Sequence, residues 1–313
     1  MTKARPSTIA ADETLPGRFP IRTVANLTGV NPVTLRAWER RYNLLRPERT
    51  AKDHRLYSQQ DVDRIRKVLE LLDRGIAISQ VTGLLEDNTA QLKPAQTSNR
   101  DDIWQDYRTR MLAAIGRFDE AAVDSIYNDA LSLYPVEMVN NRVTTELLRS
   151  LGDTWKKQPL AIAEEHFFSV YLRNKLGSRI HHLNQRSTGP LLLLACLPGE
   201  YHEIGLLFFA LAAVNRGYRA LILGANMPLE LLPEVIHQRR CDAIVLSGSA
   251  RLPTAVLQDA LPALVKAVKI PVFVGGAAAE RHQEGIEHAK AIYVGKDIQP
   301  ALQSISETLA ATG

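Results

Sequence analysis

The chain has 313 residues, of which 45% are hydrophobic and 23% charged, so wholesale disorder is excluded and two or three packed domains are affordable. The longest uninterrupted apolar run, Leu206 to Val214, is far shorter than the ~20 residues that a membrane-spanning helix needs. Residues 1–85 hold 15 Lys and Arg against 9 Asp and Glu, whereas the remainder holds 23 against 25. This basic N-terminal part suggests nucleic acid as a partner, although a solvated surface explains the charge alone equally well.

The two cysteines, Cys196 and Cys241, lie in apolar, strand-like contexts without a second cysteine at metal-binding spacing. Buried, reduced thiols are the simple interpretation, and they suit the cytoplasm. No apolar stretch follows the early basic residues, so we expect no secretory signal. We therefore expect a cytoplasmic protein with no membrane partner.

A helix-turn-helix is predicted near the N-terminus. Residues 1–17 lack periodicity and are expected to form a flexible tail, and short helical patterns fill residues 18–85. A helix over Arg22–Thr28 is followed by a glycine turn and by a second helix, capped by Asn31 with Pro32 at its first position. The expected core residues are Val24, Leu27, Val30, Leu35 and Trp38.

The segment Phe19–Leu85 resembles the DNA-binding domain of the MerR family, since it combines VxxLTGVNPxTLRAWERRY with RPxRT and HRLYS. In that family the second helix enters the major groove and a wing holds the DNA backbone. The contacts that this resemblance implies are Thr34, Arg36, Arg40, Arg41, Arg55 and Tyr57. Asp53 stands at the wing tip where the family often has glycine, and aspartate tolerates such turns. Ser58 is expected to cap the next helix, with Asp61 three positions on.

The rest of the chain predicts two further domains. Residues 86–101 are polar and are expected to form a linker. Residues 102–186 predict a four-helix bundle; its helices are expected over Ile103–Ile115, Phe118–Leu133, Pro135–Trp155 and Leu160–Leu183. Residues 187–313 alternate apolar strands with helices, which predicts a doubly wound parallel α/β sheet. Its strands are expected over Leu191–Leu197, Ala220–Leu223, Ala243–Leu246, Val272–Val274 and Ala291–Val294.

Ligands of such sheets bind outside the carboxyl ends of the strands. There the first strand leads into Glu200-x-His202-x-x-Gly205. A neutral imidazole is a good transition-metal ligand, and a carboxylate behind it fixes the tautomer. Gly205 would let a helix begin close to a bulky group. Taken alone, this short motif fits a plain surface histidine better than a ligand.

Small residues follow the third and fourth strands, and they leave room for a planar group beside the sheet. These residues are Ser247, Ser249, Gly275 and Gly276. The whole arrangement resembles the cobalamin-binding domain of methionine synthase and related proteins, where the pattern is Asp-x-His-x-x-Gly, then Ser-x-Leu, then Gly-Gly. The resemblance implies that His202 is the lower cobalt ligand and that the small residues line the slot for the benzimidazole of the cofactor. Glu200 replaces the aspartate and Ser249 the leucine.

Trp155 precedes the pair Glu165-His166 by nine residues, a spacing similar to that in the cap of light-sensing cobalamin regulators of the CarH/LitR type. The resemblance implies adenosylcobalamin, with methylcobalamin as the alternative, covered on its upper face by these three residues. It also implies a non-enzymatic repressor that binds a double-stranded DNA operator in the dark as a homo-oligomer, a dimer or tetramer, and is released by light.

Three alternatives stay open at this point. A cobalamin-level sensor would need no response to light. A corrinoid methyl carrier uses the same sheet and a similar bundle, but has no use for a helix-turn-helix. A regulator that no longer holds cobalamin would work through a protein partner.

Overall fold

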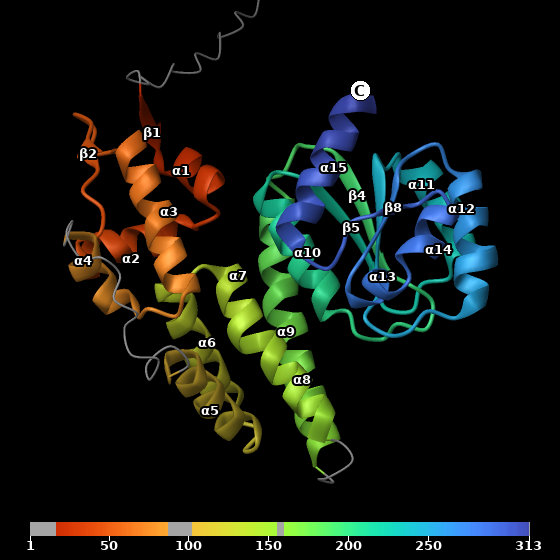
Figure 1. Ribbon diagram of the computed structural model, residues 1–313, viewed down its shortest axis with the longest axis horizontal. Coiled ribbons are helices and arrows are strands. Elements are labelled where there is room, and N and C mark those ends of the chain that lie inside the picture. The colour runs from red at the N-terminus through yellow and green to blue at the C-terminus, as the bar shows by residue number, and fades with distance from the viewer. Residues whose placement is uncertain (1–16, 87–101, 155–159, 313) are drawn as a thin grey trace, which may run out of the picture. The chain divides into compact units, whose positions relative to one another are not determined.

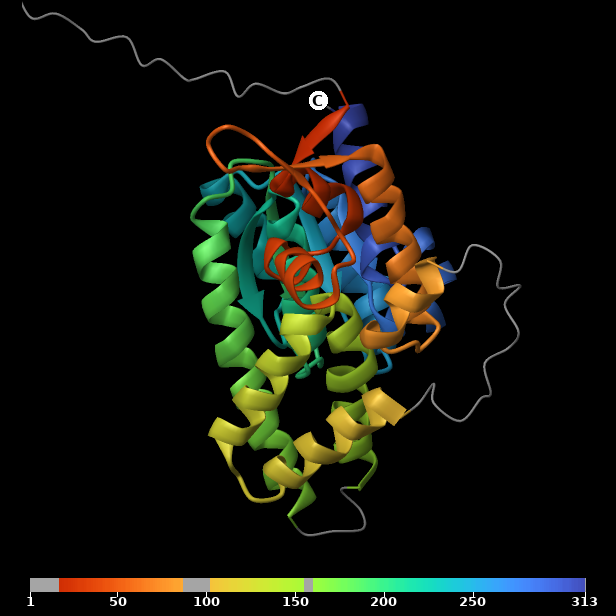
Figure 2. The ribbon, with the colours of Figure 1, turned by 90° about the vertical axis from the view of Figure 1, so that its left-hand side faces the viewer.

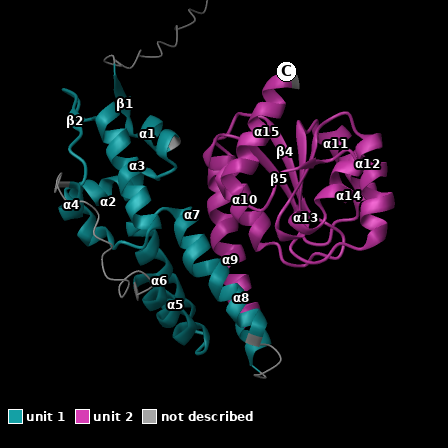
Figure 3. Ribbon diagram, in the orientation of Figure 1, with its two compact units in different colours: residues 1–164 teal, residues 165–313 magenta. Residues whose placement is uncertain are grey.

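The computed structural model describes residues 17–86, 102–154 and 160–312. The chain forms two compact units, one up to Glu164 and one from Glu165 (Figure 3). Nearly all of the expected tail and linker, and Trp155 with them, lie outside the described residues. The expected limits of the bundle, 102–186, stay a prediction.

The first unit begins with the predicted helix-turn-helix, α1 (Ile21–Thr28) and α2 (Pro32–Tyr42). Gly29 ends α1 with φ +72°, a left-handed conformation that glycine adopts without strain. The Asn31 side chain caps α2 by accepting hydrogen bonds from the backbone N–H of Val33 and of Thr34, each at 2.9 Å. Local sequence chemistry alone therefore sets where α2 begins.

Four of the five expected core residues of this motif are fully buried, namely Val24, Val30, Leu35 and Trp38. Leu27 is not, because it lies in the last turn of α1 with its side chain on the surface. Three short strands complete the domain in the order β1-β3-β2, with bounds β1 (Arg18–Pro20), β2 (Glu48–Arg49) and β3 (Arg55–Ser58). Strand β1 was not expected, because three residues are too few to show a period.

The loop between β2 and β3 is the wing, and it extends beyond the helices of its domain (Figure 2). Asp53 takes the left-handed conformation there, with φ +61°, as the turn requires. Ser58 and Asp61 form the expected capping box at the start of α3 (Gln59–Asp73), and α4 (Ile78–Glu86) follows.

The next helices are α5 (Asp102–Ile115) and α6 (Glu120–Leu133), close to their predicted bounds. The predicted single helix from Pro135 is instead α7 (Val136–Val139), a π-helical turn η2 (Asn140–Thr144) and α8 (Thr145–Thr154). A π turn is a single-turn feature inside a longer helix, and one turn is too short to be recognised in a hydrophobic pattern. Helix α9 (Ala161–Asn184) leads into the second unit.

The second unit is the predicted parallel sheet, with strand order β5-β4-β6-β7-β8. The strands are β4 (Leu191–Cys196), β5 (Arg219–Gly224), β6 (Ala243–Ser247), β7 (Val272–Gly275) and β8 (Ile292–Tyr293). The chain moves outward from β4 to β5 and then returns to the other side of β4 at β6. The loops after β4 and β6 therefore flank the topological switch point, where doubly wound sheets bind their ligands.

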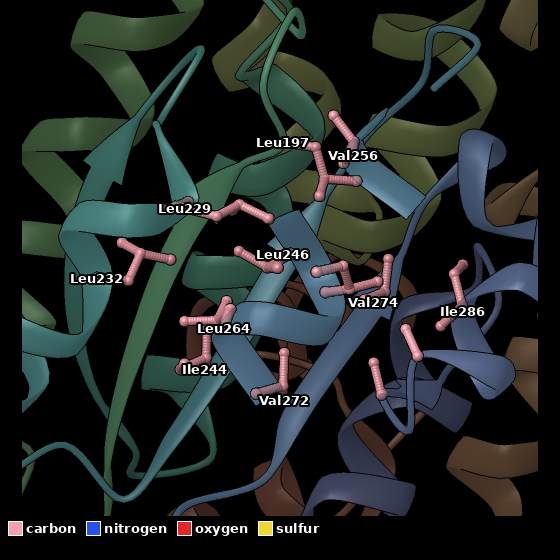
Figure 4. Close-up of a cluster of buried hydrophobic side chains, with 14 of the residues drawn as sticks. Leu197, Leu229, Leu232, Ile244, Leu246, Val256, Leu264, Val272, Val274 and Ile286 are labelled. Atoms are coloured by element: carbon pink, nitrogen blue, oxygen red, sulfur yellow. The ribbon is translucent and has the colours of Figure 1, made fainter. Parts of the chain in front are cut away.

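Helices cover both faces of this sheet (Figure 1). One face carries α10 (Ile204–Asn215) and α15 (Ile298–Thr312). The other carries α11 (Leu232–Arg239), α12 (Leu261–Ala267), α13 (Ala277–Arg281) and α14 (Gln283–His288). Figure 4 shows the core on that second face, where Ile244, Leu246, Val272 and Val274 project from the strands toward Leu264. A fully buried core fixes the strand register and thus the position of every loop at the carboxyl edge.

A substitution at Gly276 tests how closely the loops at the carboxyl edge of the sheet are packed. A Cβ added there would lie 2.4 Å from the Gly248 carbonyl oxygen, and its φ is +95°. We expect Gly276→Ala to lower the free energy of unfolding by more than about 2 kcal/mol, measured by denaturant unfolding without cofactor. Gly205→Ala is the matched control, because a Cβ there meets nothing within 4 Å. Equal stability of the two variants would contradict the close packing at Gly276.

Candidate functional site: a basic recognition helix and a histidine at the sheet edge

Helix α2 presents a cationic surface. Arg36, Arg40 and Arg41 are all exposed, as contact with DNA would require. Arg36 and Arg40 lie four residues apart and therefore share a face of the helix. Their contact with DNA stays a prediction.

Two predicted DNA contacts are buried instead. Thr34 lies against α6, where its hydroxyl donates to the Leu131 carbonyl at 3.3 Å, while the Trp38 indole N–H donates to the Leu133 carbonyl at 2.9 Å. These carbonyls belong to the last turn of α6, whose C=O groups have no partner within the helix. Tyr57 is enclosed in the core of the winged domain, and burial is the main cause that raises its pKa to about 12. The choice of Thr34 and Tyr57 as DNA contacts was therefore wrong.

Arg55 is only partly exposed, because its guanidinium joins the wing to α2. Its Nε lies 2.6 Å from Glu39 Oε2, and Arg49 approaches the other Glu39 oxygen at 3.4 Å. Arg49 also pairs with Asp53 at 2.6 Å. The sequence analysis did not identify Glu39 as a functional residue. The structure gives it a role, because it lies on α2 and pairs with two arginines of the wing strands, Arg49 and Arg55. Glu39 sets how the wing and the recognition helix are placed relative to each other.

The second cluster lies in the loop after β4. Glu200 is a buried carboxylate, only 2% exposed. Its Oε1 accepts hydrogen bonds from the His202 backbone N–H at 2.7 Å and from His202 Nδ1 at 2.8 Å. An ionised carboxylate can only accept, so Nδ1 carries a hydrogen, and in the neutral imidazole Nε2 then has the lone pair. The His202 side chain is 63% exposed, which leaves the imidazole available as a ligand.

The other Glu200 oxygen holds the loop after β6. Oε2 accepts from the Ser249 backbone N–H, from Ser249 Oγ at 2.7 Å and from the Ala250 N–H at 2.9 Å. Burial by itself raises the pKa of the Glu200 carboxyl, but the hydrogen bonds from Ser249, His202 and Ala250 outweigh it and lower the pKa to about 2. Ser249, expected to line a slot, is thus bonded to the carboxylate that orients His202. Arg281 donates a further hydrogen bond to the Ser249 carbonyl.

The predicted small residues do lie together at this edge. Ser247 pairs with Cys196 on one side and with Gly275 on the other. The Gly248 N–H donates to the Gly275 carbonyl at 3.2 Å. Close contact with the Gly248 backbone already explains why position 276 is glycine, with or without a cofactor. The role of Ser247, Gly275 and Gly276 in lining a slot for the cofactor therefore stays a prediction.

An ion pair joins α9 to the histidine loop. Arg173 on α9 contacts Glu203, which directly follows His202 and precedes α10. Neither residue belongs to the predicted site, and no sequence signal links residues 30 positions apart. Movement of the histidine loop relative to α9 would strain or break this pair.

The expected upper-face residues are described in part. Glu165 and His166 lie on α9, where Glu165 Oε1 accepts from Ser169 Oγ at 2.7 Å and the His166 side chain is exposed. Their role above the cofactor, like that of Trp155, stays a prediction. In the part of the chain that the structure describes, no helix is long and apolar enough to cross a membrane.

The donor set at His202 fits a cobalt ion whose other ligands come from a macrocycle. It offers one imidazole nitrogen of fixed tautomer, with a carboxylate behind it. Over the described ranges, no group of three or more His, Cys, Asp or Glu side chains could hold a bare metal ion. Gly205, in the first turn of α10, is exposed and leaves open space beside this loop.

Glu200→Gln tests the anchor. The amide can no longer accept every hydrogen bond that the carboxylate accepts, so we expect a loss of about 3 kcal/mol in the free energy of unfolding at pH 7. Ser249→Ala removes only one side-chain bond and should cost about 1–2 kcal/mol. Denaturant unfolding of both variants without cofactor measures these changes. If Glu200→Gln has the same free energy of unfolding as wild type, the carboxylate does not hold the two loops.

Comparison with known proteins gives matches along both units. Residues 19–88 match the family model for the MerR HTH family regulatory protein, and residues 107–179 match the model for a B12 binding domain. The fold of a monomethylamine corrinoid protein from Methanosarcina barkeri aligns with a TM-score of 0.51 at 17% identity, over 64% of this chain and 98% of that one. That likeness supports the fold.

Two relatives from Myxococcus xanthus span most of the chain. The HTH-type transcriptional repressor CarH is 34% identical over 85% of this chain and 91% of its own length, and CarA is 33% identical over 85% and 89%. The methionine synthase of Mycobacterium tuberculosis matches only 36% of this chain and 11% of its own length, at 26% identity. The chain therefore belongs to the family of CarH and CarA, cobalamin-binding transcriptional regulators of the MerR type.

Proposed function

We propose that the protein is a light-responsive repressor, which binds operator DNA as a homo-oligomer when loaded with adenosylcobalamin and leaves it after illumination. The observation that carries this proposal is the Glu200–His202 pair at the switch point of the sheet. Further support comes from two relatives, the transcriptional repressors CarH and CarA. This chain aligns with each of them over nearly the whole length of the relative.

His202 would hold the cobalt from below through Nε2, with Glu200 fixing the ring and raising the basicity of that nitrogen. Ser247, Gly275 and Gly276 would border the benzimidazole tail, and Gly205 would leave room for the corrin. Trp155, Glu165 and His166 would cover the adenosyl group. When bound, adenosylcobalamin would supply a cobalt–carbon bond that visible light breaks.

The second unit offers a physical link from this site to α9. A change in the His202 loop reaches Arg173 on α9 through Glu203. Moving a two-state assembly from 1:99 to 99:1 requires ~5.5 kcal/mol of differential binding, within reach of a large buried cofactor. Ligand and operator need only favour the same assembled state for their binding to be coupled.

Arg40 tests the DNA contact. We expect Arg40→Ala to weaken operator binding and to lower the slope of log affinity against log salt by about one unit per half-site, because each lost phosphate contact releases about one counterion fewer. Arg66→Ala is the control, since Arg66 lies on α3 and pairs with Asp63. Titration at several salt concentrations measures the slope. An unchanged slope in Arg40→Ala would remove Arg40 from the interface.

His202 is tested by electron paramagnetic resonance of the cobalt(II) form. In protein made with ¹⁵N-histidine, the nitrogen hyperfine pattern should change from that of ¹⁴N to that of ¹⁵N, and His202→Ala should abolish the protein-derived coupling. His237→Ala, on α11, should leave it unchanged. If the hyperfine pattern is the same with ¹⁴N- and ¹⁵N-histidine, the coupled nitrogen does not come from a protein histidine. The benzimidazole of the cofactor would then remain the lower cobalt ligand, and His202 would not be the ligand.

The response to light is tested by size-exclusion chromatography and operator titration, in the dark and after green light. We expect the protein loaded with adenosylcobalamin to be the larger species in the dark, and illumination to reduce both its size and its affinity for the operator. Loading with methylcobalamin compares the two upper ligands. Equal size and affinity in both conditions would favour a sensor of cobalamin level.

A further inference from the structure

One apolar side chain stands out on the cationic face of α2. Val33 is 61% exposed, although it belongs to the first turn of a helix in which Leu35, Ala37 and Trp38 are buried. Arg36 and Arg40 follow it by three and seven residues, so the three side chains form one stripe along the helix. Thr34 and Trp38 lie on another side of α2, against α6.

The position of Val33 is rigid. Its backbone N–H donates to the Asn31 side chain at 2.9 Å, and Pro32 precedes it at the start of the helix. A β-branched side chain in a helix has one strongly preferred rotamer. The bonds of Thr34 and Trp38 to α6 also fix the rotation of α2 about its axis. The two methyl groups of Val33 are therefore held outward at the N-terminal end of the recognition helix.

The N-terminal residues of a recognition helix reach the base edges in the major groove. The arginines of this stripe suit phosphates and guanine, whereas a valine can neither donate nor accept a hydrogen bond. The apolar feature that a major groove offers is the C5-methyl group of thymine. We infer that Val33 is a specificity-determining residue that recognises a thymine methyl group in each operator half-site.

This inference rests on the proposed binding of operator DNA and adds to it which base is recognised. It differs from a role in phosphate binding, because loss of a methyl contact changes base preference and leaves the salt slope unchanged. It also differs from packing against another protein surface, which would make the Val33 contribution independent of the thymine methyl.

Uracil lacks only the C5-methyl group of thymine, so it isolates the contact. The full-length protein, loaded with adenosylcobalamin in the dark, first selects its operator from random duplexes. Each thymine of that operator is then replaced by deoxyuridine, one symmetric pair at a time. The affinities of wild type, Val33→Ala and the control Leu84→Ala are measured for every duplex. Leu84 is an exposed apolar residue of α4, outside the recognition helix.

At one thymine per half-site, we expect wild type and Leu84→Ala to bind the uracil duplex about fourfold more weakly per half-site, which corresponds to one buried methylene-sized group. Val33→Ala should bind the two duplexes equally well and keep the salt slope of wild type. Circular dichroism serves as the control for folding, and we expect the Val33→Ala spectrum to match that of wild type because the side chain is exposed.

Two results would overturn the inference. If wild type and Val33→Ala respond alike to uracil at every position, Val33 does not recognise thymine, although the operator function stands. If no duplex is selected at all, the proposed operator function fails and the inference falls with it.

Discussion

The carboxylate of Glu200 is the group on which the cofactor end of this protein depends. It is buried in the loop after β4 and receives hydrogen bonds from two loops that follow different strands, its own and the loop after β6. One oxygen fixes the His202 ring and the other fixes Ser249 and Ala250. Because an ionised carboxylate cannot donate, every group around it must be a donor, and this requirement selects the tautomer that exposes Nε2 of the histidine.

At the DNA-binding end, the contacts of a single helix, α2, organise the domain. Helix α2 has three sides with different tasks: Thr34 and Trp38 bond to the end of α6, Glu39 holds the wing through Arg55, and the arginine stripe faces outward. Since a helix turns as a rigid body, the contact with α6 also sets the direction of the arginines. The position of α6 can therefore influence operator binding without touching DNA.

Several parts of the structure follow from sequence chemistry that acts over a few residues. Asn31 and Ser58 each begin a helix, and Gly29 ends one, as their short-range hydrogen bonds and backbone preferences dictate. The apolar strands could also be predicted, because strands buried on both faces, such as β4 and β7, need a continuous hydrophobic run. The strand β1 and the π turn η2 escaped prediction, since neither leaves a periodic signal of its own.

The sequence by itself determined the order of the domains, the parallel sheet and the motif that carries His202. It could not determine which side of α2 is free, because Thr34 is polar and looks exposed until α6, nearly a hundred residues later, covers it. Nor could it pair Arg173 with Glu203 or Glu200 with Ser249, which lie 30 and 49 positions apart. Such contacts depend on how packed layers bring distant segments together, and only the tertiary structure decides that.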